Sequence, residues 1–449
     1  PTVAVLTLGW SILEGIGAAL VLPAMAALIA GNFEGESRKG AYAIIGGVAG
    51  AGIAIGPILG GWATTELSWR VVFAGEVVLV LFILAVTRYV VDTPIEGDKP
   101  KLDVVGSVLA ATGLGAVVLG TLQSSTWGWV APKDSPVEPF GFSVTLFVIA
   151  GGGVLLWAFV RWQRRREGHG QDPLVHLDLL KIPPLRSGLI GMLSQNLILM
   201  GIFFSIPLYL QIVLGLDALE TGIKMLPVSI AMFITSAVGS RLSARFTVRS
   251  IVQAGLWTTL LAAVALLATI QPTLADGAFK ASMALLGVGM GLIVSQLGNV
   301  VQSSVDASGR GEAGGLQYTG QQLGSSLGVA LIGSIVLIGL GGAFVSNITD
   351  DPAIDAETEA QVEAAVEEGI DFIPADQVQS ALQEAGIDDA TSAVIVDDYE
   401  DASLKALKVG LLAAALLALV SLAFTGDLPH DPPSSGAEED EPDREVAVA

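Results

Sequence analysis

Residues 52–61 read Gly52-Ile-Ala-Ile-Gly56-Pro57-Ile-Leu-Gly60-Gly61. Gly52, Gly56 and Gly60 recur every four residues, so on a helix these glycines lie along one face. Glycines at this spacing let a second helix approach closely inside a bilayer. Pro57 removes one backbone donor and can kink the helix beside that face. The segment predicts tight helix packing in a membrane, and the order of Pro57 and Gly61 favours a helix that moves.

The glycine-rich segment lies within one of eleven apolar runs, which each approach the roughly 20 residues needed to cross a bilayer. The 449-residue chain is 52% hydrophobic and 15% charged, with a mean hydropathy of +0.66, which excludes a soluble or a disordered protein. The sequence therefore predicts an all-α polytopic membrane protein with about 11 transmembrane helices. The runs cover residues 3–30, 41–62, 71–90, 104–123, 140–160, 187–210, 222–239, 250–270, 278–301, 316–344 and 405–425.

The basic residues predict the orientation of the chain, because loops rich in Lys and Arg stay on the cytoplasmic side. With the loop 31–40 in the cytoplasm, sixteen basic residues fall inside and six fall outside. The segment 346–404 is then extracytoplasmic and the tail 426–449 is cytoplasmic. The basic run Arg161–Arg166 is interpreted as a cytoplasmic anchor that fixes this topology. We expect a multi-pass protein of the cell (plasma) membrane.

Most of the net charge of −22 belongs to two segments of the chain. Residues 346–404 hold 17 acidic and no basic residues, and residues 426–449 hold eight acidic residues and one arginine. The periodicity of residues 356–369, 374–386 and 388–404 predicts a small helical insert, whereas the composition of the tail predicts disorder. The negative charge argues against nucleic acid as a partner.

The segment Gly52-x-x-x-Gly56-Pro57-x-x-Gly60-Gly61 resembles the antiporter motif on the fifth helix of major facilitator superfamily exporters. Trp69-Arg70-x-x-Phe73 follows it, as the start of the next helix does in that family. Leu13–Ala19 resembles the fourth-helix motif, although Ser11 and Glu14 stand where Arg and Gln are usual. A second glycine row falls on the fifth helix of the second half, as the counterpart of the first row. Its members are Gly320, Gly324 and Gly328.

The resemblance implies the major facilitator fold, in the drug:proton antiporter branch with fourteen transmembrane spans. The run 3–30 is then the family's fourth helix, and we expect three further helices before residue 1. The implied layout has six parts: the remainder of the N-terminal six-helix half at 1–90, a cytoplasmic linker and extra helix pair at 91–160, a basic cytoplasmic loop at 161–186, the C-terminal six-helix half at 187–345 and 405–425, the acidic insert at 346–404, and the tail at 426–449.

Two carboxylates lie within apolar runs, and an ionisable residue inside a span is by default a functional candidate. Glu14 lies about 16 Å into its run, on a face shared with Thr7 and Ser11 that is predicted to look into the bundle. Glu76 lies about 8 Å into its run, near the outer end. Both are predicted proton-coupling residues. The alternative for Glu14 is an interhelical hydrogen-bond donor, and for Glu76 a partner of Arg70 or Lys224.

Amide side chains cluster in the spans of the second half. They are candidates for lining a substrate cavity, although polar side chains also hold membrane helices together through hydrogen bonds. The candidates are Gln195, Asn196, Gln296, Asn299, Gln317 and Gln321.

The sequence argues against an enzyme. There is no cysteine, and three histidines without a metal-binding motif predict no metal site. No phosphate-binding loop occurs, so we expect no cofactor and no ATP-driven transport by this chain.

The resemblance implies a secondary active transporter that exports hydrophobic or cationic drug-like compounds in exchange for protons by alternating access. Its partners would be a small-molecule substrate, protons and the lipid bilayer, and we expect a monomer. One alternative is an importer, or an exporter of a single metabolite, with the same fold. Another is a membrane sensor that binds a ligand at residues 346–404.

Overall fold

The computed structural model describes residues 2–21, 25, 52, 55–56, 58–89, 102–306, 309–368 and 372–430. Every regular element among these residues is a helix. Ten of the helical segments are long and apolar enough to cross a membrane. They correspond to ten of the eleven predicted spans and confirm the all-α membrane architecture. The eleventh prediction, 41–62, lies mostly outside the described residues.

The helices fall into four groups along the chain. The N-terminal group comprises α1 (Val3–Leu6), η1 (Thr7–Glu14), η2 (Ala63–Leu67) and α4 (Trp69–Thr87). A helical hairpin follows, with α5 (Val104–Trp127), η3 (Pro139–Gly141) and α6 (Val144–Gly168). The main bundle consists of η4 (Leu177–Lys181), α7 (Pro183–Leu208), η5 (Tyr209–Val213), α8 (Ala218–Leu242), α9 (Val248–Thr269), α10 (Asp276–Ser303), α11 (Arg310–Asp350), α14 (Asp389–Ser421) and η7 (Leu422–Thr425). The last group is α12 (Ala356–Glu368) and α13 (Ala375–Glu384).

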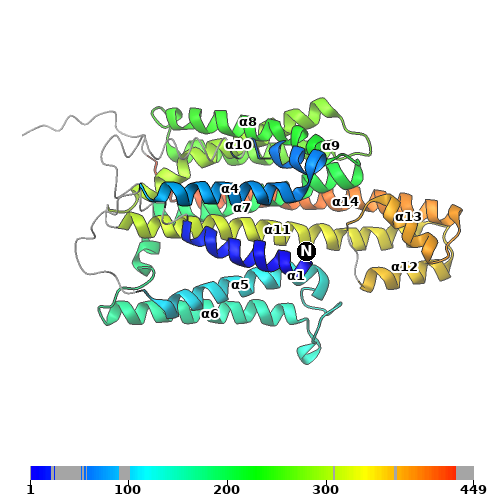
Figure 1. Cartoon of the computed structure of the whole chain (residues 1–449), viewed down its shortest axis with the longest axis horizontal. Helices are drawn as coiled ribbons and strands as arrows, with labels where there is room; N and C mark the ends of the chain where they lie inside the picture. The colour runs from blue at the N-terminus through cyan, green and yellow to red at the C-terminus, as the bar shows by residue number, and fades with distance from the viewer. Residues whose placement is uncertain are drawn as a thin grey trace, which may run out of the picture.

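Six long helices, α7 to α11 and α14, pack side by side as the main bundle (Figure 1). Within it, α10 packs against both α8 and α9, and α11 packs against both α7 and α14. Phe279, Met283, Leu286 and Met290 of α10 are fully buried. Their spacing of four, three and four residues places them on one face of the helix. This face of α10 supplies a central part of the apolar core.

The second glycine row allows α11 to lie directly on α7. A β-carbon added at Gly324 would collide with the backbone of Leu193, and one added at Gly328 would collide with the backbone of Leu197. At Gly320 a β-carbon would lie 3.6 Å from the carbonyl oxygen of Leu189. The contacted residues on α7 are also four apart, so the two helices run together over about two turns.

The hairpin of α5 and α6 lies on one flank of the bundle (Figure 1). Its attachment runs through α5 and α11. The hydroxyls of Ser124 on α5 and Ser334 on α11 are 2.8 Å apart and both are buried. Small residues also let α5 and α6 pack closely against each other, because a β-carbon at Gly152 on α6 would lie 2.8 Å from the carbonyl oxygen of Gly113 on α5.

Helices α11 and α14 continue past the bundle and carry α12 and α13 at their far end (Figure 1). Phe344 and Tyr399 form an edge-to-face pair there, with ring centroids 5.5 Å apart. The Tyr399 hydroxyl accepts a hydrogen bond from the Ile373 N–H at 2.9 Å and donates one to the Ile373 carbonyl at 3.0 Å. Helices therefore occupy the acidic segment 346–404, while the division of the chain into domains stays a prediction.

The opposite end of the bundle holds the start of α7 together with the residues after α14. Arg186 forms an ion pair with Asp427 at 2.8 Å. The Ser187 hydroxyl donates to the Phe424 carbonyl at 2.9 Å. Residues 426–430 and the helices α12 and α13 thus lie at opposite ends of the bundle, as a membrane between them requires.

The role of the glycine row can be tested with a matched pair of alanine substitutions on α11. Gly324→Ala should lower the stability of the folded protein by about 1–3 kcal/mol, because the new methyl group meets the α7 backbone. Gly342→Ala, on the same helix, has nothing within 4 Å of its added carbon and should be neutral or up to about 1 kcal/mol stabilising. Thermal unfolding in detergent measures both. Equal responses of the two variants would contradict the close packing of α11 on α7.

Candidate functional site

Glu14 ends the π-helical segment η1, which begins at Thr7. Stretches of π-helix are rare, and they frequently occur at functional sites. The Glu14 side chain is exposed in the structure, as is nearly all of η1. The burial that was expected for this face is therefore not seen among the described residues, and the proton-coupling role of Glu14 stays a prediction.

Glu76 lies in the second turn of α4, and its side chain is also exposed. The two cations considered as its partners are engaged elsewhere. The Arg70 guanidinium stacks on the Trp69 ring, 4.6 Å from its centroid. Lys224 forms an ion pair with Asp276, which also binds Lys280 at 2.6 Å. The structure thus gives no support to Glu76 as a structural partner of Arg70 or Lys224.

An aromatic contact brings the two candidate carboxylates to neighbouring helices at a similar level. The rings of Trp10 on η1 and Phe73 on α4 meet edge to face, with centroids 5.6 Å apart. Glu14 follows Trp10 by four residues and Glu76 follows Phe73 by three, so each carboxylate lies about one turn beyond the contact. No local pattern in the sequence indicates that these two helices meet at this level.

The antiporter motif is described at Gly52, Gly56, Gly60 and Gly61, while Pro57 lies outside the described residues. A β-carbon at Gly52, Gly56 or Gly60 would have nothing within 4 Å in the part of the chain that the structure describes. At Gly61 it would collide with the backbone of Ala218 and Leu219 at the start of α8. The close approach predicted along Gly52, Gly56 and Gly60 therefore stays a prediction, and the contact at Gly61 lies next to that row rather than on it.

The amide residues predicted to line a cavity differ in their burial and in their hydrogen-bond partners. Gln296 is buried and its Nε2 donates to the Gly239 carbonyl at 2.8 Å, so it links α10 to α8. Asn196 donates to the carbonyl of Met192 in its own helix at 3.0 Å. Gln195 is buried in α7, whereas Asn299 is exposed. These placements favour helix packing for Gln296.

The remaining amides gather where α7, α10 and α11 meet. Gln302 Nε2 on α10 donates to Gln317 Oε1 on α11 at 3.4 Å. Gln321, one turn further along α11, lies with its Nε2 3.8 Å from the Met192 sulfur on α7. All three glutamines are partly buried. The structure brings Gln317 and Gln321 together as predicted neighbours, and their role in substrate binding stays a prediction.

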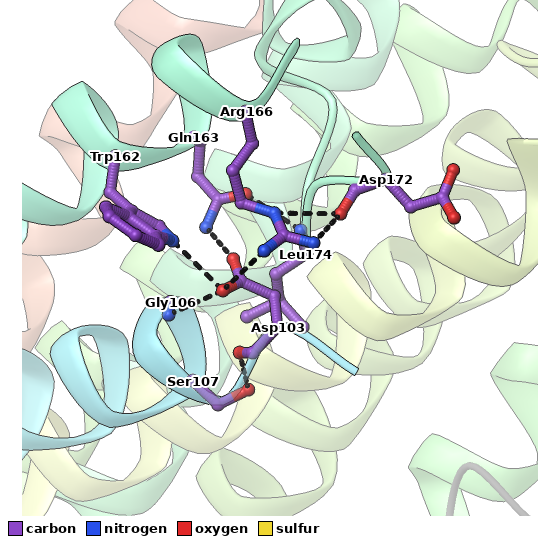
Figure 2. Close-up of polar contacts among 8 residues, drawn as sticks. All are labelled: Asp103, Gly106, Ser107, Trp162, Gln163, Arg166, Asp172 and Leu174. Carbon is purple, nitrogen blue, oxygen red and sulfur yellow. Dashed lines mark hydrogen bonds and ion pairs between the residues drawn. The ribbon is translucent and has the colours of Figure 1, made fainter. Parts of the chain in front are cut away.

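A buried carboxylate that the predicted site did not include joins the two helices of the hairpin. Figure 2 shows Asp103 at the start of α5 surrounded by side chains from the end of α6. Asp103 Oδ1 accepts hydrogen bonds from the Gly106 N–H and from Trp162 Nε1, each at 3.0 Å. Oδ2 accepts from Gln163 Nε2 at 2.8 Å, and Arg166 Nη1 lies 3.6 Å from Oδ1.

The same side chains extend this cluster into the segment that follows α6 (Figure 2). Arg166 donates through Nε and Nη2 to the Asp172 carbonyl, at 3.0 and 2.8 Å. Gln163 Oε1 accepts from the Leu174 N–H at 2.8 Å. The cluster therefore fixes the start of α5, the end of α6 and the segment after it as one unit.

The electrostatics of Asp103 follow from these contacts. Burial by itself would raise the pKa of the carboxyl, but the hydrogen bonds from Gly106, Trp162 and Gln163 and the charge of Arg166 outweigh it. The net result holds the pKa of Asp103 below its usual range. The lowered pKa favours the ionised form of Asp103, which suits a structural role in joining α5 to α6.

A second ion pair ties the segment after α6 to α11. His176 Nδ1 lies 2.9 Å from Glu312 Oε2, and its backbone N–H donates to Glu312 Oε1. The hydrogen bond and charge of Glu312 raise the pKa of His176 above its usual value. The linker between α6 and α7 is consequently attached at both the hairpin and the bundle.

Comparison with known proteins matches the chain to the Major Facilitator Superfamily over residues 1–104 and 103–329. The chain belongs to the Major Facilitator Superfamily. Membership of this family confirms the fold predicted from the glycine motif, and with the ten candidate spans it makes the chain a multi-pass membrane protein. It also agrees with the expectation of a transporter family rather than an enzyme family.

Several relatives within this superfamily carry names that describe export. The tetracenomycin C resistance and export protein of Streptomyces glaucescens is 28% identical over 363 residues, which cover 80% of this chain and 64% of the relative. The cephamycin export protein CmcT of Amycolatopsis lactamdurans is 29% identical over 343 residues, 74% of this chain and 66% of the relative. The multidrug efflux pump LfrA of Mycolicibacterium smegmatis is 26% identical over 426 residues, 94% of this chain and 77% of the relative.

The chain spans less than two thirds of the length of several of these relatives. The fraction is 64% for the tetracenomycin C exporter, 59% for a probable actinorhodin transporter of Streptomyces coelicolor and 58% for an uncharacterised transporter of Bacillus subtilis. The activity, substrates and partners of the whole protein are accordingly matters of proposal.

The Asp103 cluster predicts how stability depends on one charge and on pH. Asp103→Asn should lower stability at pH 7 by about 1–3 kcal/mol, because an amide nitrogen faces a hydrogen-bond donor and the charge is lost. The folded-state pKa of Asp103 is depressed, so its contribution is present above about pH 4 and is lost as the pH falls through the lower folded value. The gap between wild type and variant should therefore shrink below about pH 4 in thermal unfolding. Asp134 is an exposed residue of the same hairpin, and Asp134→Asn should change neither the stability at pH 7 nor its dependence on pH.

Proposed function

We propose that the protein is a secondary active transporter that exports hydrophobic or cationic drug-like compounds in exchange for protons. The observation that carries this proposal is the membership of the Major Facilitator Superfamily together with relatives named for export or multidrug efflux. The antiporter-like motif supports it, and its last glycine, Gly61, lies against the backbone at the start of α8.

The proposed coupling uses carboxylates within the N-terminal spans. Glu14 and Glu76 each lie about one turn beyond the Trp10–Phe73 contact, on adjacent helices. A carboxylate inside a span either binds a proton or faces a cation, because the bare charge is costly in lipid. Protons arriving from outside and cationic substrate arriving from inside would compete for these two groups. Such competition couples proton entry to substrate exit.

The proposed motion is alternating access between the two halves of the fold. Family members of this kind bind substrate between two pseudo-symmetric halves and rock one half against the other. The glycines of the motif supply a face without bulky side chains, and Gly61 already contacts the α8 backbone. The protein would reside in the cell membrane as a monomer, with the 426–449 tail cytoplasmic and residues 346–404 outside.

A second candidate is an exporter of a single compound rather than of many. Two of the relatives are named for one substrate each, tetracenomycin C and cephamycin. This candidate shares the fold, the orientation and the coupling residues with the first. It differs in predicting efflux of one compound and no response to unrelated lipophilic cations.

The experiment that tests the proposal uses the full-length gene product in inverted membrane vesicles. Transport of ethidium is followed with a pH gradient imposed and then collapsed, in the wild type and in Glu14→Gln and Glu76→Gln. Gradient-driven transport should occur in the wild type and should be abolished by at least one substitution, because glutamine cannot exchange a proton. Glu138→Gln removes an exposed carboxylate between α5 and α6 and should leave transport unchanged.

Each outcome of this experiment has a defined meaning. Transport that persists after the gradient collapses would overturn proton coupling. Gradient-driven transport that survives both substitutions would remove Glu14 and Glu76 from the mechanism. Absence of ethidium transport, followed by gradient-driven transport of one compound such as tetracenomycin C or cephamycin, would establish the single-compound exporter instead.

A further inference from the structure

The outward face of α6 carries a hollow that the transport proposal does not use. Its volume is about 470 Å³, and it is open on one side. The residues that line it recur at intervals of three, one, three and one, so they form a single stripe along the helix. They are Trp157, Val160, Arg161, Arg164 and Arg165.

The three arginines of this stripe can bind an external anion. Their side chains are exposed, and no carboxylate among the described residues forms an ion pair with them. Arg166, the fourth arginine of the run, points the other way and is bound to Asp103 and Asp172 (Figure 2). The run therefore contains one structural arginine and three exposed cations without an ion pair to any described carboxylate.

The length of α6 places these cations at a membrane surface. Helix α6 begins at Val144, so Arg161 lies about 26 Å along its axis and Arg165 about 32 Å. The hydrocarbon core of a bilayer is about 30 Å thick. The three arginines consequently reach the headgroup level at the membrane face where α6 ends, which the charge distribution predicts to be cytoplasmic. Trp157 lies one turn deeper, at the depth where tryptophan is enriched in membrane proteins.

The tryptophan and the arginines are arranged as one surface. The Arg161 guanidinium lies 5.6 Å from the centroid of the Trp157 ring, within the range of a cation–π interaction. Trp157 and Val160 supply an apolar wall below the charges, and both are at least partly exposed. A ligand that fits must have a compact anion at one end and an apolar chain at the other.

The rotation of α6 that creates this surface is fixed by the Asp103 cluster. Trp162, Gln163 and Arg166 all bind toward Asp103 or the segment after α6. Residues 161, 164 and 165 then have to lie on the opposite side of the helix. The stripe is therefore preorganised, which reduces the entropy lost when a ligand is bound.

We propose that this stripe is a binding site for an anionic phospholipid of the leaflet at which α6 ends. Guanidinium groups bind phosphate oxygens in a bidentate manner, and three arginines line the hollow. The first acyl carbons lie along Trp157 and Val160. A role of Arg161–Arg166 in topology alone accounts for basic residues at this position, but not for the tryptophan-lined hollow or for the inward turn of Arg166.

The test compares two double variants of the full chain that remove the same charge. The proteins compared are the wild type, Arg161→Gln/Arg164→Gln and Arg241→Gln/Arg245→Gln. Each is purified, delipidated in mild detergent and titrated with phosphatidylglycerol or phosphatidylcholine. Native mass spectrometry counts the bound lipid. Arg241 and Arg245 are exposed, lie four residues apart around the end of α8 and serve as the matched control. Phosphatidylglycerol should bind the wild type and the control pair alike, and should bind the α6 variant at least about tenfold more weakly.

A third variant keeps the test decisive if the α6 double variant does not fold. Trp157→Leu retains every charge and alters an exposed side chain, and it should weaken phosphatidylglycerol binding about two- to fivefold. The proposal would be overturned if the wild type bound phosphatidylcholine as tightly as phosphatidylglycerol. It would also be overturned if the α6 and α8 double variants lost the same affinity, or if the α6 double variant and Trp157→Leu both kept full affinity. Competition by inorganic phosphate alone, without any contribution of Trp157, would assign the hollow to free phosphate.

Discussion

Inside a bilayer the backbone has no water to bind, so each span must be a helix, and helices hold together through close packing rather than through exclusion of water. In this protein the contact of α11 with α7 shows how the constraint is met. Gly324 and Gly328 lie against the backbones of Leu193 and Leu197, where any side chain would separate the helices. Helix α11 also packs on α14 and α5, so the bundle and the hairpin are both arranged around it.

At the ends of the helices, polar groups rather than glycines hold neighbouring helices together. Asp103 is almost completely buried, and a lone buried carboxylate would be strongly destabilising. Three hydrogen-bond donors and one guanidinium satisfy it, and these partners come from both helices of the hairpin. The same partners turn Arg166 inward and leave the other arginines of α6 outward. One internal carboxylate thus determines which charges of a basic run face the membrane surface.

The sequence predicted what depends on local pattern and missed what depends on distant contacts. Hydropathy located ten of the described spans, and glycine spacing identified the face of α11 that meets α7. The position of Asp103 before an apolar run is a recognisable helix-start signal, but its partner Gln163 is 60 residues away and carries no local sign of the contact. For Gln296 the amide composition alone does not distinguish a cavity residue from one that holds two helices together, and its hydrogen bond to Gly239 could not be predicted from the sequence. The contact between Trp10 and Phe73 likewise could not be predicted from the periodicity of the sequence.

The continuity of two helices links the acidic segment to the transport fold. Helix α11 runs without interruption from Arg310 to Asp350, and α14 runs from Asp389 to Ser421. Asn347 joins these two helices near α12 and α13: its side-chain amide donates to the Asp398 carbonyl and accepts from Lys405. Long helices curve gently unless a specific feature kinks them, so a tilt of α11 or α14 within the membrane would displace α12 and α13 as well. The negatively charged segment 346–404 is therefore mechanically connected to α11 and α14, so a tilt of either helix would also shift the electric field of that segment.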